Sequence, residues 1–286
     1  MHKFLIIFLS LILFYSCSLE KFVIRQTGTL LDYGVIALYE ETDLVIAEQA
    51  LASNIKLLEG MIKGDPENEH LLMLTSQAIA GYVLGFVEDE NPERARPLYL
   101  RARNYAARVL YQNGFNLTEE NLLIDQYKKK VDSIDEEQID ALFWSAFSWA
   151  GWINLSLDNP QSFVDLPKVE VLMNRVLEID STYYHGAGLL FFGSIWGTKP
   201  KMLGGDPEKA KQYFERNLEI TKGNFLLTYV YYARYYAAKI LDEDLYKNQL
   251  NTIKETPNDV LPGEQLLNAI AKKKADYLLS RTEDIF

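Results

Sequence analysis

Residues 206–221 read DPEKAKQYFERNLEIT, and this stretch decides the fold. An Asp side chain can cap the free N–H groups at the start of a helix, Pro suits the first helical position, and the Glu that follows is favoured by the helix dipole. The same punctuation occurs at residues 91–95, which read NPERA. In each copy an aromatic residue, Tyr99 or Phe214, stands four positions after the Ala. Two near copies of one helix start indicate a chain built from repeated helices.

Further junctions between helices recur at residues 62–67 (IKGDPE), 177–183 (LEIDSTY) and 253–257 (IKETP). The steps from Asp180 to Thr221 and on to Thr256 are 41 and 35 residues. Tetratricopeptide repeats have a period of about 34 residues, and their second helix carries an Ala-x-x-x-Phe step like that from residue 210 to 214. The sequence therefore predicts an all-α fold, a stack of helical hairpins similar to a tetratricopeptide-like α-solenoid.

The long segments between these junctions favour helices over strands, because they are capped and contain no internal proline. They cover residues 71–87, 139–153, 184–196, 225–240 and 264–280. The polar stretch 114–138 is expected to be a loop with a short helix.

The N-terminus reads MHKFLIIFLSLILFYSC, with a basic Lys3 before an apolar run that is too short to span a bilayer. Cys17 is the only cysteine, and Ser16 before it resembles the lipobox of bacterial lipoproteins. We expect a signal peptide over residues 1–16, a lipidated Cys17 with a tether over 17–28, and a single helical domain over 29–286. An ordinary secretory signal or an uncleaved anchor are the alternatives. The mature chain would lie in the bacterial periplasm, attached to the inner or the outer membrane by lipid alone.

Charge and histidine spacing exclude several classes of function. The formal net charge is −11, which disfavours binding to phosphate backbones, so we expect no nucleic-acid partner. The three histidines, His2, His70 and His185, have no metal-ligand spacing. No metal and no cofactor are therefore expected.

Catalytic motifs are also missing from the sequence. Gly204 and Gly205 precede no Gly-Lys-Ser/Thr, so they predict a tight turn rather than a phosphate loop. The run 88–90 (EDE) is interpreted as a solvated helix end rather than an acid/base pair. Helical lytic transglycosylases use a Glu-Ser pair, and the chain contains none. We expect a binding protein rather than an enzyme.

Bulky aromatic residues gather on a few helices, and the candidate ligand-cavity residues are chosen among them: Phe191, Phe192, Trp196, Tyr232 and Tyr236. Aromatic residues at helical spacing usually pack a core, and that interpretation stays open here. Two features favour a lined groove or channel. Glycines at 186, 188, 193 and 197 let helices approach or open space beside a ring, and the Tyr-rich segment 226–240 supplies polar tips to an apolar lining.

Together these residues resemble the T component of tripartite ATP-independent periplasmic (TRAP) transporters. The resemblance rests on the lipobox at Cys17, the helical pair 72–110, the stretch 189–236 and the long loop 197–205 inside it. It implies a periplasmic lipoprotein that pairs with a solute-binding P component, and self-association as a trimer or another homo-oligomer. It also implies an internal channel for a small organic or apolar ligand.

The inserted loop supplies the candidate partner contacts Lys199, Leu203, Gly204 and Gly205. The alternative function is a tetratricopeptide scaffold lipoprotein of outer-membrane or pilus assembly. Such scaffolds have more regular repeats, so the irregular period and the 197–205 loop count against it.

Overall fold

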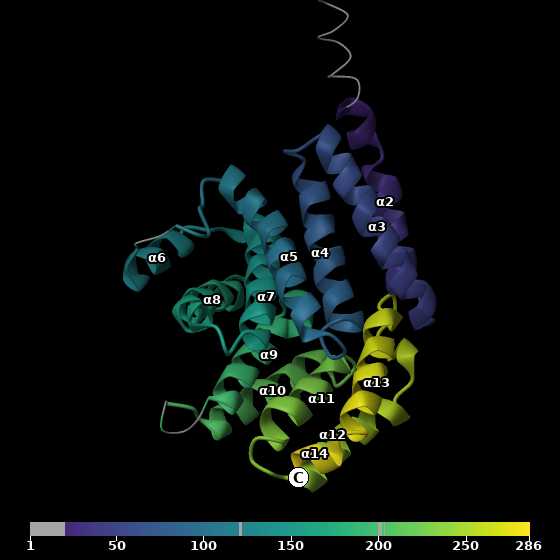
Figure 1. Cartoon of the computed structure of the whole chain (residues 1–286), viewed down its shortest axis with the longest axis vertical. Helices are drawn as coiled ribbons and strands as arrows, with labels where there is room; N and C mark the ends of the chain where they lie inside the picture. The colour runs from purple at the N-terminus through teal and green to yellow at the C-terminus, as the bar shows by residue number, and fades with distance from the viewer. Residues whose placement is uncertain (1–20, 120–121, 200–201, 203) are drawn as a thin grey trace, which may run out of the picture.

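The computed structural model describes residues 21–119, 122–199, 202 and 204–286, and helices dominate it (Figure 1). None of these residues lies in a β-strand, which confirms the all-α prediction. The helices are α2 (Gly28–Tyr39), α3 (Leu44–Gly64), α4 (Glu69–Phe86), α5 (Pro92–Gln112), α6 (Ile124–Val131), η1 (Glu136–Gln138), α7 (Ile139–Leu155), α8 (Pro160–Ile179), α9 (Tyr183–Thr198), α10 (Pro207–Thr221), α11 (Leu227–Tyr232), η3 (Ala233–Ala237), α12 (Glu243–Glu255), η4 (Asn258–Val260), α13 (Gln265–Leu279) and α14 (Thr282–Ile285).

The two repeated helix starts form as the sequence predicts. The Asn91 side chain accepts a hydrogen bond from the backbone N–H of Arg94 at 3.0 Å, and the Asp206 side chain accepts one from Lys209 at 3.1 Å. In both helices Pro occupies the first turn, where no backbone donor is needed. Each cap satisfies one orphan N–H group, so α5 and α10 begin where the local sequence sets them.

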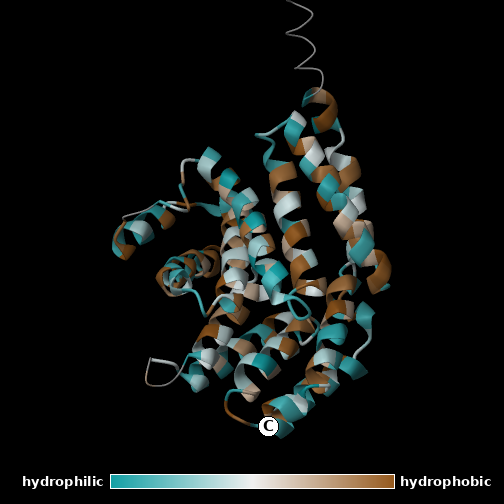
Figure 2. Ribbon diagram, in the orientation of Figure 1, coloured by the Kyte–Doolittle hydropathy of each residue, from teal (hydrophilic) through white to brown (hydrophobic). Residues whose placement is uncertain are grey.

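Consecutive helices pack against one another along the chain, as in α3 on α4, α4 on α5, α5 on α7, α7 on α8, and α9 on α10. The stack then closes, because α13 contacts both α2 and α3 (Figure 1). Figure 2 shows that many hydrophobic segments of the helices lie toward the interior of this arrangement. The last long helix thus completes a wall around the space inside the stack.

The N-terminal part differs from the expected tether. Residues 21–26 are helical, and α2 begins at Gly28, so helix replaces most of the tether expected over 17–28. The signal peptide and Cys17 lie outside the described residues. None of the residues of α2 is fully buried, so this helix lies on the outside of the stack.

The stretch 114–138 contains the short helix α6 between irregular segments, as predicted. Across the part of the chain that the structure describes, the search for membrane spans found no helix with the length and apolar character to cross a bilayer.

Candidate functional site: an apolar cavity inside the helical stack

A cavity of about 540 Å³ occupies the space that the stack encloses. Its walls come from α2, α3, α4, α5, α7, α8, α9, α11, η3 and α13, so segments from both ends of the chain contribute to it. Apolar side chains dominate the lining and include Leu31, Val35, Leu51, Leu74, Phe147, Leu190, Phe191 and Ile270. A drug-sized apolar molecule fits a cavity of this volume and character.

Two glycines in the lining leave part of this space open. A Cβ atom built on Gly34 of α2 or on Gly81 of α4 would meet nothing within 4 Å. Gly197 has the opposite role, because a Cβ there would lie 2.1 Å from the carbonyl oxygen of Tyr235. The end of α9 can therefore approach the backbone of η3 only because residue 197 has no side chain, which confirms that a glycine of this series allows close helix approach.

The Tyr-rich segment presents two faces, and the structure places a different pair in the cavity from the pair nominated. Tyr231 and Tyr235 line the cavity, with ring centroids 5.4 Å apart. Tyr232 stacks on Phe214 of α10 at 5.1 Å, and Tyr236 packs against Tyr232 at 5.3 Å. The nominated pair therefore packs in the core between α10 and η3.

The segment 233–237 is a π-helix, which is a rare element that is enriched at functional sites. A π-helical turn contains an extra residue, so side chains after it point in directions that a 3.6-residue period does not give. Tyr235 lies inside this turn and still shares the cavity wall with Tyr231. The other face, with Tyr232, packs on α10, and the spacing of the tyrosines does not show which of the two faces takes which position.

Of the three aromatic residues nominated on α9, Phe191 lies in the cavity wall. Phe192 is buried against Tyr213 of α10, with ring centroids 5.6 Å apart. Trp196 is half-buried, and the ammonium of Lys209 lies 3.8 Å from its ring centroid. Only the first of the three therefore contacts the cavity directly.

The inserted loop lies beside the cavity. Thr198 and Lys199 are part of the lining, and the backbone N–H of Asp206 donates to the carbonyl of Trp196 at 3.3 Å, which closes the base of the loop. Gly204 has a φ of +84°, as expected for a tight turn before a capped helix, and Gly205 follows it. Leu203 lies outside the described residues.

The N-terminal end of α9 carries an unusual backbone conformation at the cavity wall. Tyr184, His185 and Gly186 have φ values of 44°, 57° and 67°, in the left-handed region. Such a conformation costs about 1–3 kcal/mol at each non-glycine residue unless its surroundings hold it. The buried side chain of Asn217 holds it by donating to the carbonyl of His185 at 2.7 Å and to that of Gly186 at 2.8 Å. The hydroxyl of Tyr184 lies 3.3 Å from that of Tyr39 on α2, and both rings line the cavity.

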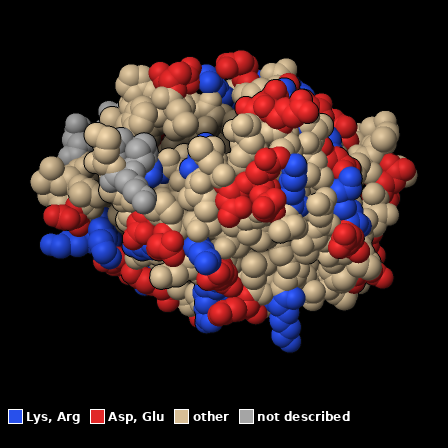
Figure 3. All heavy atoms as spheres, turned by 90° about the horizontal axis from the view of Figure 1, so that it is seen from below, with Lys and Arg blue, Asp and Glu red and all other residues tan. Residues whose placement is uncertain are grey.

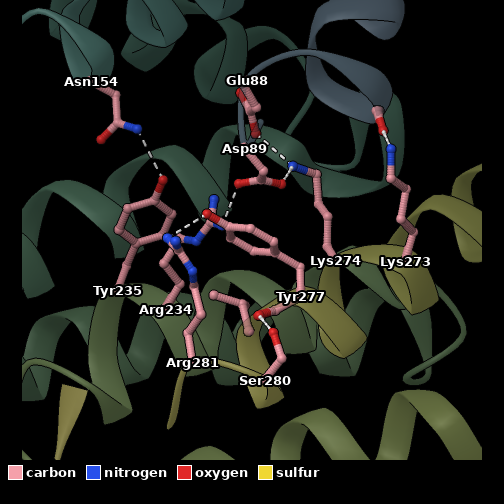
Figure 4. Close-up of polar contacts among 12 residues, drawn as sticks. Glu88, Asp89, Asn154, Arg234, Tyr235, Lys273, Lys274, Tyr277, Ser280 and Arg281 are labelled. Atoms are coloured by element: carbon pink, nitrogen blue, oxygen red, sulfur yellow. Dashed lines mark hydrogen bonds and ion pairs between the residues drawn. The ribbon is translucent and has the colours of Figure 1, made fainter. Parts of the chain in front are cut away.

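A buried ion cluster, drawn in Figure 4, borders the cavity at Glu88. Lys274 of α13 is 2% exposed, and its ammonium donates to Glu88 at 2.7 Å and to Asp89 at 2.6 Å. Arg234 of η3 donates to the other oxygen of Asp89. Glu88, which is 12% exposed, also accepts a hydrogen bond from the hydroxyl of Tyr99 and is the member of the four that lines the cavity.

This cluster corrects the interpretation of residues 88–90 as a solvated helix end. Glu88 and Asp89 are 12% and 17% exposed, and only Glu90, with its side chain 63% exposed, fits that description. Two carboxylates and two basic groups balance in formal charge, which is how charges are tolerated in a protein interior. No local pattern in the sequence indicates this cluster, since the basic partners lie 145 and 185 residues further along the chain.

The electrostatics of the site follow from burial and from these pairs. Burial alone would raise the pKa of Asp89, but the ammonium of Lys274 and the guanidinium of Arg234 hold this pKa below its usual value. Burial raises the pKa of Tyr231 well above its usual value, and the nearby carboxylate of Glu88 adds to this. Tyr231 therefore keeps its proton at any physiological pH.

No group of three or more potential metal ligands was found among the residues that the structure describes. What the arrangement offers is an apolar space with a few polar groups in its lining, which suits the binding of a small molecule. Figure 3 shows acidic and basic side chains interleaved over the face seen from below, with no continuous basic patch on that face.

Comparison with known proteins agrees with a transport role. A family model described as TRAP transporter T-component matches residues 40–286. A search of curated proteins found no match. The matched range begins directly after α2 and includes all the other helices that form the cavity wall. The chain therefore belongs to the TRAP transporter T-component family.

Proposed function

We propose that this T component binds a partly apolar small molecule in the cavity and works beside the solute-binding P component of its transporter. The observation that carries the proposal is the cavity itself, which is about 540 Å³ in volume and walled mainly by apolar side chains. Packed protein interiors contain few voids larger than a water molecule, so an apolar space of this size needs an explanation. A bound ligand explains it.

The energetic argument favours an apolar ligand. Burying apolar surface contributes roughly 25 cal/mol per Å² removed from water, and a preformed site avoids much of the cost of ordering the protein. Wide apolar faces for such contacts are offered by three aromatic rings of the cavity wall, those of Phe191, Tyr231 and Tyr235. An empty apolar cavity gains none of these contacts.

We place the contact with the P component on the inserted loop. Lys199 lines the cavity and also begins the loop that contains Gly204 and Gly205, so a protein seated on the loop would lie next to the ligand. Met202 within the loop is 97% exposed, so its apolar side chain is available for a partner to cover. The proposed contact surface is Lys199, Met202, Leu203, Gly204 and Gly205.

The proposed location is outside the cytoplasm, with Cys17 carrying the lipid that attaches the chain to a membrane. Self-association as a homo-oligomer, with a trimer as one form, is part of the same proposal. The scaffold alternative is less well supported, because tetratricopeptide scaffolds offer an open concave groove. Here α13 contacts α2 and α3, so helices from both ends of the chain surround the inner space instead of leaving an extended concave face.

The partner proposal is tested by a pull-down with the solute-binding subunit of the same transporter. We expect the protein to capture that subunit, and Met202→Asp to weaken capture at least tenfold. Leu123→Asp is the matched control, because Leu123 is also an exposed apolar residue, 71% exposed, but lies outside the inserted loop. Equal capture by both variants would place the contact elsewhere, and no capture by the unchanged protein would contradict the pairing.

A further inference from the structure

The polar end of the cavity is formed by Glu88 and Tyr231, and it has a definite chemical preference. We infer that this end recognises a hydrogen-bond-donating head group, so that the ligand is an apolar molecule ending in an amine or a hydroxyl rather than in a carboxylate. The inference rests on the proposed ligand binding, and it names the class of molecule that this site takes.

Glu88 is held in one place and retains capacity to accept more hydrogen bonds. One of its oxygens accepts from the hydroxyl of Tyr99, and the other accepts from Lys274 at 2.7 Å. A carboxylate has about four lone-pair sites, so each oxygen can accept a second donor. The side chain lines the cavity, and its two protein partners fix its position before any ligand arrives.

Tyr231 differs from the other tyrosines of the cavity wall. Five tyrosines line the cavity, and four of them use their hydroxyls within the protein. Tyr99 donates to Glu88, the hydroxyls of Tyr39 and Tyr184 lie within hydrogen-bond distance of each other, and Tyr235 accepts from the amide of Asn154 at 3.1 Å.

The hydroxyl of Tyr231 has no hydrogen-bond partner among the described residues. Tyr231 is half-buried, so a polar group of the ligand could give its hydroxyl a hydrogen bond at the cavity wall. A head group that both donates to Glu88 and meets Tyr231 uses both of these polar groups.

The sign of the charge at this end decides between head groups. Lys274 and Arg234 neutralise the cluster from behind, and neither is part of the cavity lining, whereas the carboxylate of Glu88 is (Figure 4). Lys199 is the other charged residue of the lining, but it is exposed, and its ammonium lies 5.9 Å from the ring centroid of Trp196 at the start of the inserted loop. At the end formed by Glu88 and Tyr231, the charged group of the lining is therefore the carboxylate. An ammonium head would be attracted, a hydroxyl would be accepted, and a carboxylate head would be repelled in a site with little water to screen it.

Three probes with the same alkyl chain test this inference: octylamine, octan-1-ol and octanoate, titrated calorimetrically into the protein at pH 7. A charge-assisted hydrogen bond in a desolvated site contributes enough to make octylamine at least about tenfold tighter than octanoate. Glu88→Gln should remove most of this difference. Equal affinities, or tightest binding of octanoate, would overturn the inference while leaving ligand binding intact.

A second variant, Tyr231→Phe, tests the inference even if Glu88→Gln does not fold. Tyr231→Phe removes only a hydroxyl that has no partner among the residues that the structure describes, so the variant should fold normally. It should weaken octan-1-ol binding about threefold to tenfold, with little effect on octanoate. Tyr232→Phe is the control on the core face of the same helix and should leave all three affinities unchanged. If Tyr231→Phe leaves octan-1-ol binding unchanged, the inference is wrong. Absence of saturable binding by every probe would contradict the proposed function as well.

Discussion

Filling the cavity from Gly81 should stabilise the protein and abolish ligand binding at the same time. Gly81 lies in the middle of α4 and lines the cavity, and a Cβ atom there meets nothing within 4 Å. A leucine at this position can therefore enter the space that a ligand would use without displacing a neighbour. Few substitutions that inactivate a binding site are expected to raise stability, so the combination is diagnostic.

The size of the effect follows from two contributions. Replacing an interior glycine of a helix by a good helix former gains about 0.8 kcal/mol. Burying the leucine side chain gains roughly 1.5–3 kcal/mol, of which about 0.5–1 kcal/mol is lost as rotamer entropy. We expect Gly81→Leu to raise the free energy of unfolding by about 2 kcal/mol, which corresponds to roughly 4–8 °C in Tm for a chain of this size.

The assays are thermal unfolding and calorimetric titration of octylamine. Gly60→Leu is the matched control, because Gly60 lies on the exposed side of α3, and a Cβ there also meets nothing within 4 Å. The control should gain only the helix-propensity contribution, about 0.8 kcal/mol, and should bind octylamine normally. Gly81→Leu should bind at least tenfold more weakly than the unchanged protein. Unimpaired binding by a folded Gly81→Leu would refute the assignment of this cavity as the site.

Three further predictions concern stability. Gly197→Ala should lower the free energy of unfolding, measured in urea, by about 1–3 kcal/mol, because the new Cβ would lie 2.1 Å from a carbonyl oxygen of η3 and must push α9 away. An unchanged urea midpoint would show that the close approach is relaxed in solution. Lys274→Met should lower the free energy of unfolding by about 3–5 kcal/mol, because it leaves buried carboxylates uncompensated. Lys273→Met removes only a partly exposed ion pair and should change it by less than about 1 kcal/mol. Similar losses in the two variants would contradict a buried cluster. The pKa of Asp89 is lower in the folded than in the unfolded protein, so this residue stabilises the fold above its unfolded pKa, and the stabilisation is lost as the pH falls through the folded pKa. The free energy of unfolding, measured against pH, should therefore fall below about pH 4. Asp89→Asn should make this fall smaller.

The helices could be predicted from the sequence because their signals are local. A cap such as Asn91 or Asp206 lies within three residues of the N–H group it satisfies, so the helix start is encoded where it forms. The sequence leaves two roles open for the glycine at 197, close helix approach or space beside a ring, and the structure shows the close approach. These elements depend on neighbours in the chain, and sequence patterns report them well.

The cavity lining could not be predicted in the same way. The spacing predicts two tyrosine faces on 226–240, but which face meets the cavity depends on the packing of the other face against α10. The acidic run at residue 88 was misinterpreted because Lys274 lies 186 residues away from Glu88. Features that arise when the stack closes on itself have no local signature.

The most direct measurement is a crystal structure of the protein grown with octylamine. We predict electron density for the alkyl chain between Phe191, Tyr231 and Tyr235, with the amine within hydrogen-bond distance of the Glu88 carboxylate. A cavity that contains only ordered water, or that has collapsed, with the probe absent or bound on the outer surface, would contradict ligand binding in the helical stack.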